Sequence, residues 1–215
     1  MDDLASIKVV GVLSTIFLFS LTVSNYLSKE FGLVKSPVFS LKIFSTSFVL
    51  LYFTFLFVAA KKFDTVLPSR THSKGYFFIS SLLKWFVGAL AFHCGAVIYG
   101  AALFNYVEET FVWSVMMSTL VILPLLLTEV EEIPFILQGE RKTVDLTSCM
   151  CGIVIFTLLG AWFGAFTLPL DWDREWQVWP IPCAIGAISG HFISLLLSAL
   201  LLFWTYVQRN KNKIV

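Results

Sequence analysis

The sequence predicts an all-α integral membrane protein, a polytopic bundle of about six transmembrane helices with both termini in the cytosol. Of its 215 residues, 58% are hydrophobic and only 13% are charged, whereas soluble domains carry roughly 25% charged residues. The 22 phenylalanines add to this apolar excess, because they suit acyl chains and packed helices better than a solvated surface. We interpret residues 1–215 as one transmembrane domain.

Six apolar runs are long enough to cross a bilayer. A hydrocarbon core about 30 Å thick requires about 20 helical residues. Since unpaired backbone groups are not tolerated in lipid, each run is expected to be a helix. The first run follows two aspartates rather than a basic region, so we interpret it as a span and not as a signal peptide. The expected spans are about 9–28, 38–60, 76–100, 111–128, 146–168 and 181–206.

The distribution of Lys and Arg predicts the orientation. With six spans, both termini and the second and fourth loops share one side, which carries ten of these residues against three on the other side. Basic residues are enriched on the cytosolic side, so this side is predicted to be cytosolic. Lys211 and Lys213 resemble the dilysine retrieval signal of endoplasmic reticulum membrane proteins. A basic tail that anchors the last span would have the same sequence.

Four Lys and His residues fall within the expected spans: Lys42, Lys84, His93 and His191. Lys42 lies near the start of its span and can snorkel to the interface, whereas the other three lie deeper. Ionisable groups at membrane depth are expected to face the bundle interior or a polar cavity, and they indicate function by default. Lys84 and His93 lie on opposite faces of their helix, so they do not form a pair. A structural hydrogen bond to a neighbouring helix would also explain each residue, and the sequence leaves these two roles open.

The segment from Gly160 to Gly190 contains two small-xxx-small patterns, Gly160 with Gly164 and Gly186 with Gly190. Small residues let transmembrane helices approach closely, and this drives their association in lipid. Glycine is also frequent in membrane helices, so chance is the alternative. Because the two patterns flank one short loop, we expect them to form a tightly packed helical hairpin.

The loop of this hairpin combines aromatic, charged and stiff residues. Interfacial anchoring alone would explain its indoles, but not the charges among them or the prolines that restrict the backbone. We therefore expect a rigid loop that binds a polar headgroup, a divalent ion or a partner. The residues concerned are Trp172, Trp176, Trp179, Asp171, Asp173, Arg174, Glu175, Pro169, Pro180 and Pro182.

Catalysis has little support in the sequence. Asp171 and Asp173 would share a face if their segment were extended, and two carboxylates suit Mg²⁺, but no third ligand lies nearby. No P-loop, H-E-x-x-H, G-x-S-x-G or other nucleophile-and-base pattern is present. We predict no catalytic residue, no metal and no cofactor. The net charge of +1 also gives no sign of the strongly basic surface that nucleic-acid binding requires, so we predict no nucleic-acid partner.

Two stretches resemble the class F family of phosphatidylinositol-glycan biosynthesis proteins. The first is Gly160-Ala161-Trp162, then Leu168-Pro169-Leu170-Asp171-Trp172-Asp173 and Trp176-Gln177-Val178-Trp179-Pro180. The second comprises Phe92-His93, Tyr99-Gly100-Ala101, Glu109-Thr110-Phe111 and Ser118-Thr119. The chain departs from several relatives at Ala102, where they have proline, and this bears on the shape of the third loop.

The resemblance implies a non-catalytic stabilising subunit of large ethanolamine phosphate transferases. These would add phosphoethanolamine to mannoses of the glycosylphosphatidylinositol (GPI) anchor precursor in the endoplasmic reticulum. The partners implied are those catalytic subunits and membrane lipids. Two alternatives stay open: an enzyme that uses Asp171, Asp173 and His93 or His191 on a lipid phosphate, and a lipid-handling protein. The residues expected to bind a partner or lipid are Trp162, Asp171, Trp172, Asp173, Trp176, Gln177, Trp179, Pro180, His93 and Glu109.

Overall fold

The computed structural model describes residues 3–28, 32–62, 74–102, 104–128, 144–170 and 172–211. These residues form helices and connections without a strand, which confirms the predicted all-α fold. Two short helices, α2 (Gly32–Lys35) and η2 (Glu175–Gln177), lie between longer ones. Within the described ranges six helices are long and apolar enough to span a membrane. They are α1 (Asp3–Leu27), α3 (Pro37–Lys62), α4 (Lys74–Ile98), α5 (Val107–Leu125), α7 (Leu146–Ala165) and α8 (Ile181–Lys211).

Several helices begin or end at different residues from the apolar runs. Some include polar end turns that hydropathy leaves out, while α5 and α7 end before their runs do. Helix α5 begins at Val107 rather than near residue 111, and Glu108 and Glu109 lie in its first turn. Carboxylates there complement the positive end of the helix dipole. Helix α8 has 31 residues and ends at Lys211, a length of roughly 46 Å, so it is longer than a hydrocarbon core of about 30 Å.

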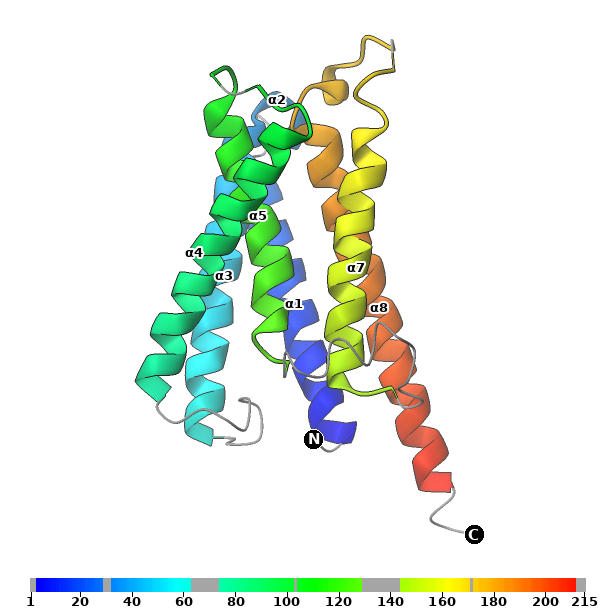
Figure 1. The fold of residues 1–215 in the computed structure, drawn as a ribbon. Helices are drawn as coiled ribbons and strands as arrows, with labels where there is room; N and C mark the ends of the chain where they lie inside the picture. The colour runs from blue at the N-terminus through cyan, green and yellow to red at the C-terminus, as the bar shows by residue number, and fades with distance from the viewer. Residues whose placement is uncertain are drawn as a thin grey trace.

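Helix α5 lies at the centre of the bundle. It packs against α3, α4 and α7, while α1 packs against α3 and α8 (Figure 1). In the most apolar segment of α5, 67% of the residues are buried, whereas in that of the peripheral helix α4 the share is 22%. Helices α7 and α8 form the most extensive pair. The arrangement thus surrounds one central helix and joins α7 and α8 as a distinct hairpin.

Polar side chains link the helices inside the bundle. Trp85 Nε1 in α4 donates a hydrogen bond to Thr119 Oγ1 in α5 at 3.1 Å, and Ser118 Oγ donates to the Trp85 carbonyl at 2.6 Å. The Tyr52 hydroxyl in α3 donates to the Leu123 carbonyl in α5. Interhelical hydrogen bonds in membranes contribute on average about 0.6 kcal/mol each. They therefore orient the helices, while close packing supplies most of the stability.

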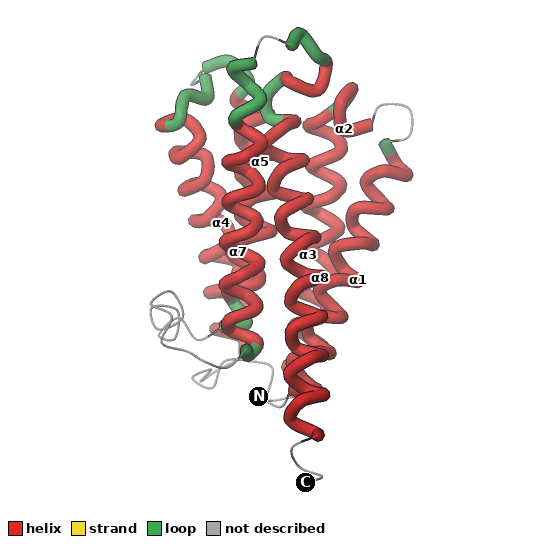
Figure 2. The backbone as a smooth tube through the Cα atoms, turned by 90° about the vertical axis from the view of Figure 1, so that its right-hand side faces the viewer, coloured by secondary structure: helices red, strands yellow, loops and turns green. Residues whose placement is uncertain are grey.

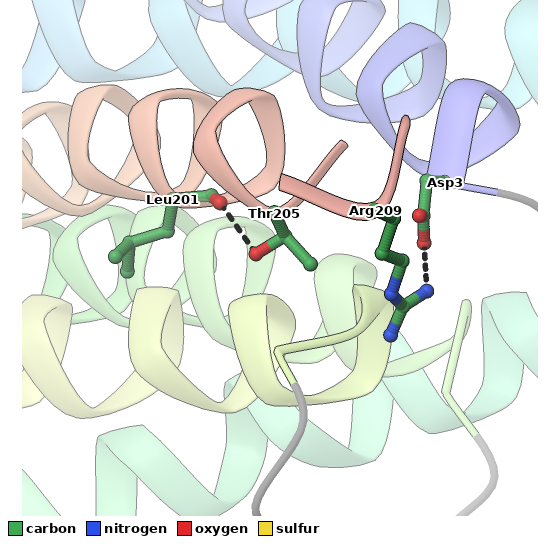
Figure 3. Close-up of polar contacts among 4 residues, drawn as sticks. All are labelled: Asp3, Leu201, Thr205 and Arg209. Carbon is green, nitrogen blue, oxygen red and sulfur yellow. Dashed lines mark hydrogen bonds and ion pairs between the residues drawn. The ribbon is translucent and has the colours of Figure 1, made fainter. Parts of the chain in front are cut away.

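The bundle has two distinct ends. The terminal end carries the start of α1 and the end of α8 (Figure 2), and there Arg209 Nη1 lies 2.5 Å from Asp3 Oδ1 (Figure 3). The hairpin end carries α2 and the connection from residue 166 to residue 180 between α7 and α8. Both termini thus lie at one end. Their location in the cytosol stays a prediction.

Candidate functional site

Helices α7 and α8 touch backbone to backbone. A Cβ atom added to Gly160 would lie 2.9 Å from the carbonyl carbon of Gly186, and one added to Gly186 would lie 2.9 Å from that of Gly160. A Cβ on Gly164 would lie 2.7 Å from the carbonyl carbon of Pro182, and Gly190 lies against Phe156 in the same way. Real Cβ atoms do not approach so closely. The four glycines permit this contact, which fixes where the hairpin loop emerges.

Gln177 holds the hairpin loop together. Its Nε2 donates to the carbonyl oxygens of Thr167 at 2.9 Å and Leu170 at 2.7 Å, and its Oε1 accepts from the Arg174 N–H at 3.0 Å. One side chain therefore joins the turn that follows α7 to η2. Asp171, which was expected to bind a partner or lipid, lies outside the described residues.

Trp179 anchors the loop on the central helix. Its Nε1 donates to Thr110 Oγ1 in α5 at 3.0 Å. Its ring packs on Trp113 with a centroid separation of 5.1 Å. Pro180 is buried beside it, and its carbonyl accepts a bond of 3.0 Å from the Ala184 N–H in the first turn of α8. Trp179, Pro180 and Gln177 thus make contacts within the chain that position the loop.

Other aromatic residues point outward from the same hairpin. Trp162, Phe166 and Trp172 are 53%, 52% and 55% exposed. Trp162 and Phe166 meet edge to face at 4.5 Å between centroids, and Trp172 and Trp176 at 6.1 Å. Phe163 and Trp176 line one groove between α7 and α8 and so connect the two pairs. We call Trp162, Phe163, Phe166, Trp172 and Trp176 the aromatic face.

The groove below the aromatic face is apolar. It has a volume of about 500 Å³ and runs along the glycine contact of α7 and α8. Its lining includes Thr167, Ile185 and Ser189 besides Trp176 at the loop. Three charged residues, Asp173, Arg174 and Glu175, are exposed in the loop between the two outward indoles. A charged rim beside exposed aromatic rings is typical of protein interaction surfaces.

A metal held by Asp171 and Asp173 was not predicted, and it would have needed an extended segment that places both carboxylates on one face. Asp173 has a φ of 47°, in the left-handed region, and Asp171 lies outside the described residues. Among the residues that the structure describes, no group of three or more His, Cys, Asp or Glu side chains is placed to hold a metal ion. The loop therefore presents charge and aromatic area.

His93 and Glu109 lie away from the aromatic face. His93 in α4 is half-buried and its ring packs against Phe111 at 6.1 Å between centroids. Its Nδ1 is buried and has no hydrogen-bond partner in the ranges that the structure covers. Glu109 in α5 directly precedes Thr110, the partner of Trp179. At the terminal end Lys211 is exposed, and Lys213 lies outside the described residues.

Two further residues of the spans, His191 and Lys84, differ in their surroundings. His191 is 2% exposed, its Nδ1 lies 3.1 Å from Thr157 Oγ1 in α7, and its ring stacks on Phe17 in α1 at 5.1 Å. It faces the interior, as expected. Lys84 is exposed, because Ser81 and Trp85 form the inward side of α4. The expectation that an ionisable residue of a span faces the interior is wrong for Lys84.

Sequence reasoning missed two contacts that shape the hairpin end. Thr110 and Trp113 in α5 receive Trp179, and Glu108 pairs with Lys42 in α3. Thr110 belongs to one of the stretches that resemble the class F family, but a residue in one helix and its partner in a distant loop share no local periodicity. Their contact follows only from the packing of whole helices.

Comparisons with known proteins match most of this chain to one family. A model of the GPI biosynthesis protein family Pig-F matches residues 16–199. The human GPI ethanolamine phosphate transferase, stabilizing subunit, is 33% identical over 134 residues, which cover 61% of this chain and 61% of that protein. The mouse protein of the same name is 38% identical over 121 residues, 54% of each chain.

A fungal relative has a different name. Glycosylphosphatidylinositol anchor biosynthesis protein 11 of Yarrowia lipolytica is 35% identical over 122 residues, 55% of this chain and 52% of that protein. The chain thus spans between half and two thirds of the length of these curated relatives. No solved structure matches.

Proposed function

We propose, because the chain belongs to the GPI biosynthesis protein family Pig-F, that it is a non-catalytic stabilising subunit of ethanolamine phosphate transferase complexes. Those complexes add phosphoethanolamine to mannoses of the GPI-anchor precursor. The human and mouse relatives are each named as a stabilizing subunit of GPI ethanolamine phosphate transferase, which supports this role. In this proposal the large subunits supply the chemistry, and this chain supplies a binding surface within the membrane.

The observation that carries the proposal is the aromatic face at the tip of a rigid hairpin. Trp162 and Trp172 are more than half exposed, while Gln177 and Trp179 fix the backbone beside them. Tryptophan is among the residues that contribute most to protein interfaces. A loop that is ordered before binding loses little conformational entropy on association. Such a surface favours tight and specific binding of a partner.

The site residues divide into two groups in this proposal. Trp162, Trp172, Trp176 and Asp173 contact the partner or the lipid beside it. Gln177, Trp179 and Pro180 position the loop, and Gly160, Gly164, Gly186 and Gly190 hold α7 against α8. Asp171 joins the first group on sequence grounds. His93 and Glu109 support the same end of the bundle through Phe111 and Thr110.

The location follows from the same premise. We place the chain in the endoplasmic reticulum membrane with both termini cytosolic, so that the aromatic face meets the luminal side. The excess of Lys and Arg at the termini and in the second and fourth loops supports this orientation. Lys211 and Lys213 would then be available on the cytosolic side as a retrieval signal.

Depletion of this protein tests the proposal. The abundance of the large transferase subunits should fall, and GPI intermediates that lack phosphoethanolamine on mannose should accumulate. Re-expression of the chain should restore both quantities. Purified chain alone should transfer no phosphoethanolamine to a mannose-containing acceptor. Normal subunit levels together with normal intermediates after depletion would defeat the proposal.

A further inference from the structure

A second groove lies between α3, α4 and α5, apart from the aromatic face. It has a volume of about 300 Å³. Lys42, Ser45 and Val49 follow one another at helical spacing and line it from α3, while Val115 lines it from α5. A volume of this size lies at the lower end of the range of small-molecule sites, about 300–1,000 Å³.

Aromatic contacts on the terminal side of Trp85 bound this groove. Helices α3 and α4 meet on the side of the terminal end, where Phe78 packs against Phe53 at 6.4 Å and Phe57 at 6.2 Å between ring centroids. Trp85, fixed by its bond to Thr119, forms part of the wall. Helix α5 packs against both other helices and closes the back. The groove therefore extends from the middle of the bundle towards the hairpin end.

A pair of opposite charges lies at the mouth of the groove. Lys42 Nζ in α3 is 2.5 Å from Glu108 Oε1 in the first turn of α5. Both side chains are more than half exposed, 53% for Lys42 and 64% for Glu108. This exposure leaves room for a further charged group beside each member of the pair. A ligand that carries one positive and one negative charge would complement both.

Ser45 supplies an unused donor inside the groove. It is 2% exposed, and its Oγ has no hydrogen-bond partner among the described residues. It follows Lys42 by three residues, roughly 5 Å along the helix. Ser47 on the same helix behaves differently, because its hydroxyl donates to the Ile43 carbonyl at 2.8 Å. A buried hydroxyl without a partner is unfavourable, and a hydrogen bond to a ligand oxygen would satisfy it.

We propose that this groove binds one zwitterionic phospholipid from the leaflet at the hairpin end. Lys42 contacts the phosphate, Glu108 contacts the ammonium, and Ser45 donates to a phosphate or ester oxygen. One acyl chain lies against Val49 and Val115 as far as Trp85. The apolar walls exclude a fully polar ligand, and an anionic lipid would place a second negative charge beside Glu108 without bringing the ammonium that Glu108 contacts. The site is independent of the partner surface.

Lipid retention tests this site. The full-length protein is reconstituted in nanodiscs of equal parts phosphatidylcholine and phosphatidylglycerol and then transferred to mild detergent, and the retained lipids are counted by native mass spectrometry. One phosphatidylcholine per chain should remain, enriched by about fivefold, which corresponds to roughly 1 kcal/mol. Ser45→Ala should remove this retention. Ser47→Ala is the matched control and should keep it, because the Ser47 hydroxyl is satisfied by its own helix.

A second variant tests the charge pair. Glu108→Gln should abolish the preference for phosphatidylcholine, because the ammonium loses its partner. The proposal is overturned if the wild-type chain retains no lipid, or retains the two lipids in the ratio of the nanodisc. It is also overturned if Ser45→Ala and Ser47→Ala retain lipid equally. Ser45→Ala breaks no hydrogen bond among the described residues, so it is expected to fold even if Glu108→Gln does not.

Discussion

Trp179 Nε1 donates a hydrogen bond to Thr110 Oγ1 at 3.0 Å, across 69 residues of sequence. The bond joins the hairpin loop to the central helix, and the Trp113 ring supports it at 5.1 Å. The loop is thus attached to the bundle at a point other than its own two helices. Any change at either residue should act on the order of the loop before it acts on the helices.

Trp179→Phe should loosen the loop without unfolding the bundle. The substitution removes the indole N–H and keeps an aromatic ring over Trp113, so the loss is that of one hydrogen bond, about 1 kcal/mol. Hydrogen exchange at residues 172–178 should become faster, by roughly fivefold for a change of that size. Trp172→Phe is the control, since Trp172 is 55% exposed. Equal exchange rates in the two variants would contradict the anchoring role.

The three indoles of the loop show what the sequence can predict and what it cannot. Trp172, Trp176 and Trp179 stand in one short charged segment and look equivalent in the sequence. Apolar length predicted the helices, and the glycine patterns predicted a close hairpin. Which indole turns inward depends on Thr110 and Trp113, which belong to another helix. Only the packing of α5 against the hairpin distinguishes an anchor from an exposed ring.

Contacts between charged residues of different helices are equally hard to predict from the sequence. Lys42 and Glu108 were each visible as polar residues near the end of an apolar run. Their ion pair depends on the approach of α3 to α5, which no local pattern encodes. Lys84 differs from this pair. Its depth within the span predicted that it would face the bundle interior, but it lies on the exposed face of α4. For these residues, the sequence predicts how deep a residue lies in its span more reliably than it predicts which way the side chain points.

Gly160→Ala should destabilise the hairpin. The new Cβ would lie 2.9 Å from the Gly186 carbonyl carbon, so α7 and α8 must separate. Overpacking of this kind costs about 1–3 kcal/mol. The matched control is Gly11→Ala in α1, where no atom lies within 4 Å of the new Cβ and helix propensity improves by up to about 1 kcal/mol.

Thermal unfolding in detergent, followed by tryptophan fluorescence, measures both glycine variants. The Gly160→Ala variant should unfold at a lower temperature than the wild type, and the Gly11→Ala variant at the same or a higher temperature. If the two variants shift the transition equally, the backbone contact between α7 and α8 does not limit stability.

The orientation can be measured with single cysteines at the two ends. Arg174 and Lys211 are both exposed, and Cys94→Ala removes the one exposed native cysteine. In sealed microsomes with the cytosolic side outward, a membrane-impermeant maleimide should label Lys211→Cys directly. It should label Arg174→Cys only after permeabilisation, because the hairpin loop is proposed to face the lumen. The opposite pattern would show that the positive-inside argument fails for this chain.

The aromatic face should determine recovery of the partner subunits. Trp172→Ala with Trp176→Ala removes two rings that contact each other at 6.1 Å, and interface tryptophans typically contribute at least about 2 kcal/mol each. Co-purification of the large transferase subunits should therefore fall by tenfold or more, while insertion stays normal because these rings support little of the core. The control is Trp204→Ala, since Trp204 is 65% exposed on α8 in the half of that helix nearer the terminal end. Equal recovery with both variants would mean that the partner binds elsewhere on the bundle, whereas loss with Trp204→Ala alone would move the interface to the terminal half of α8.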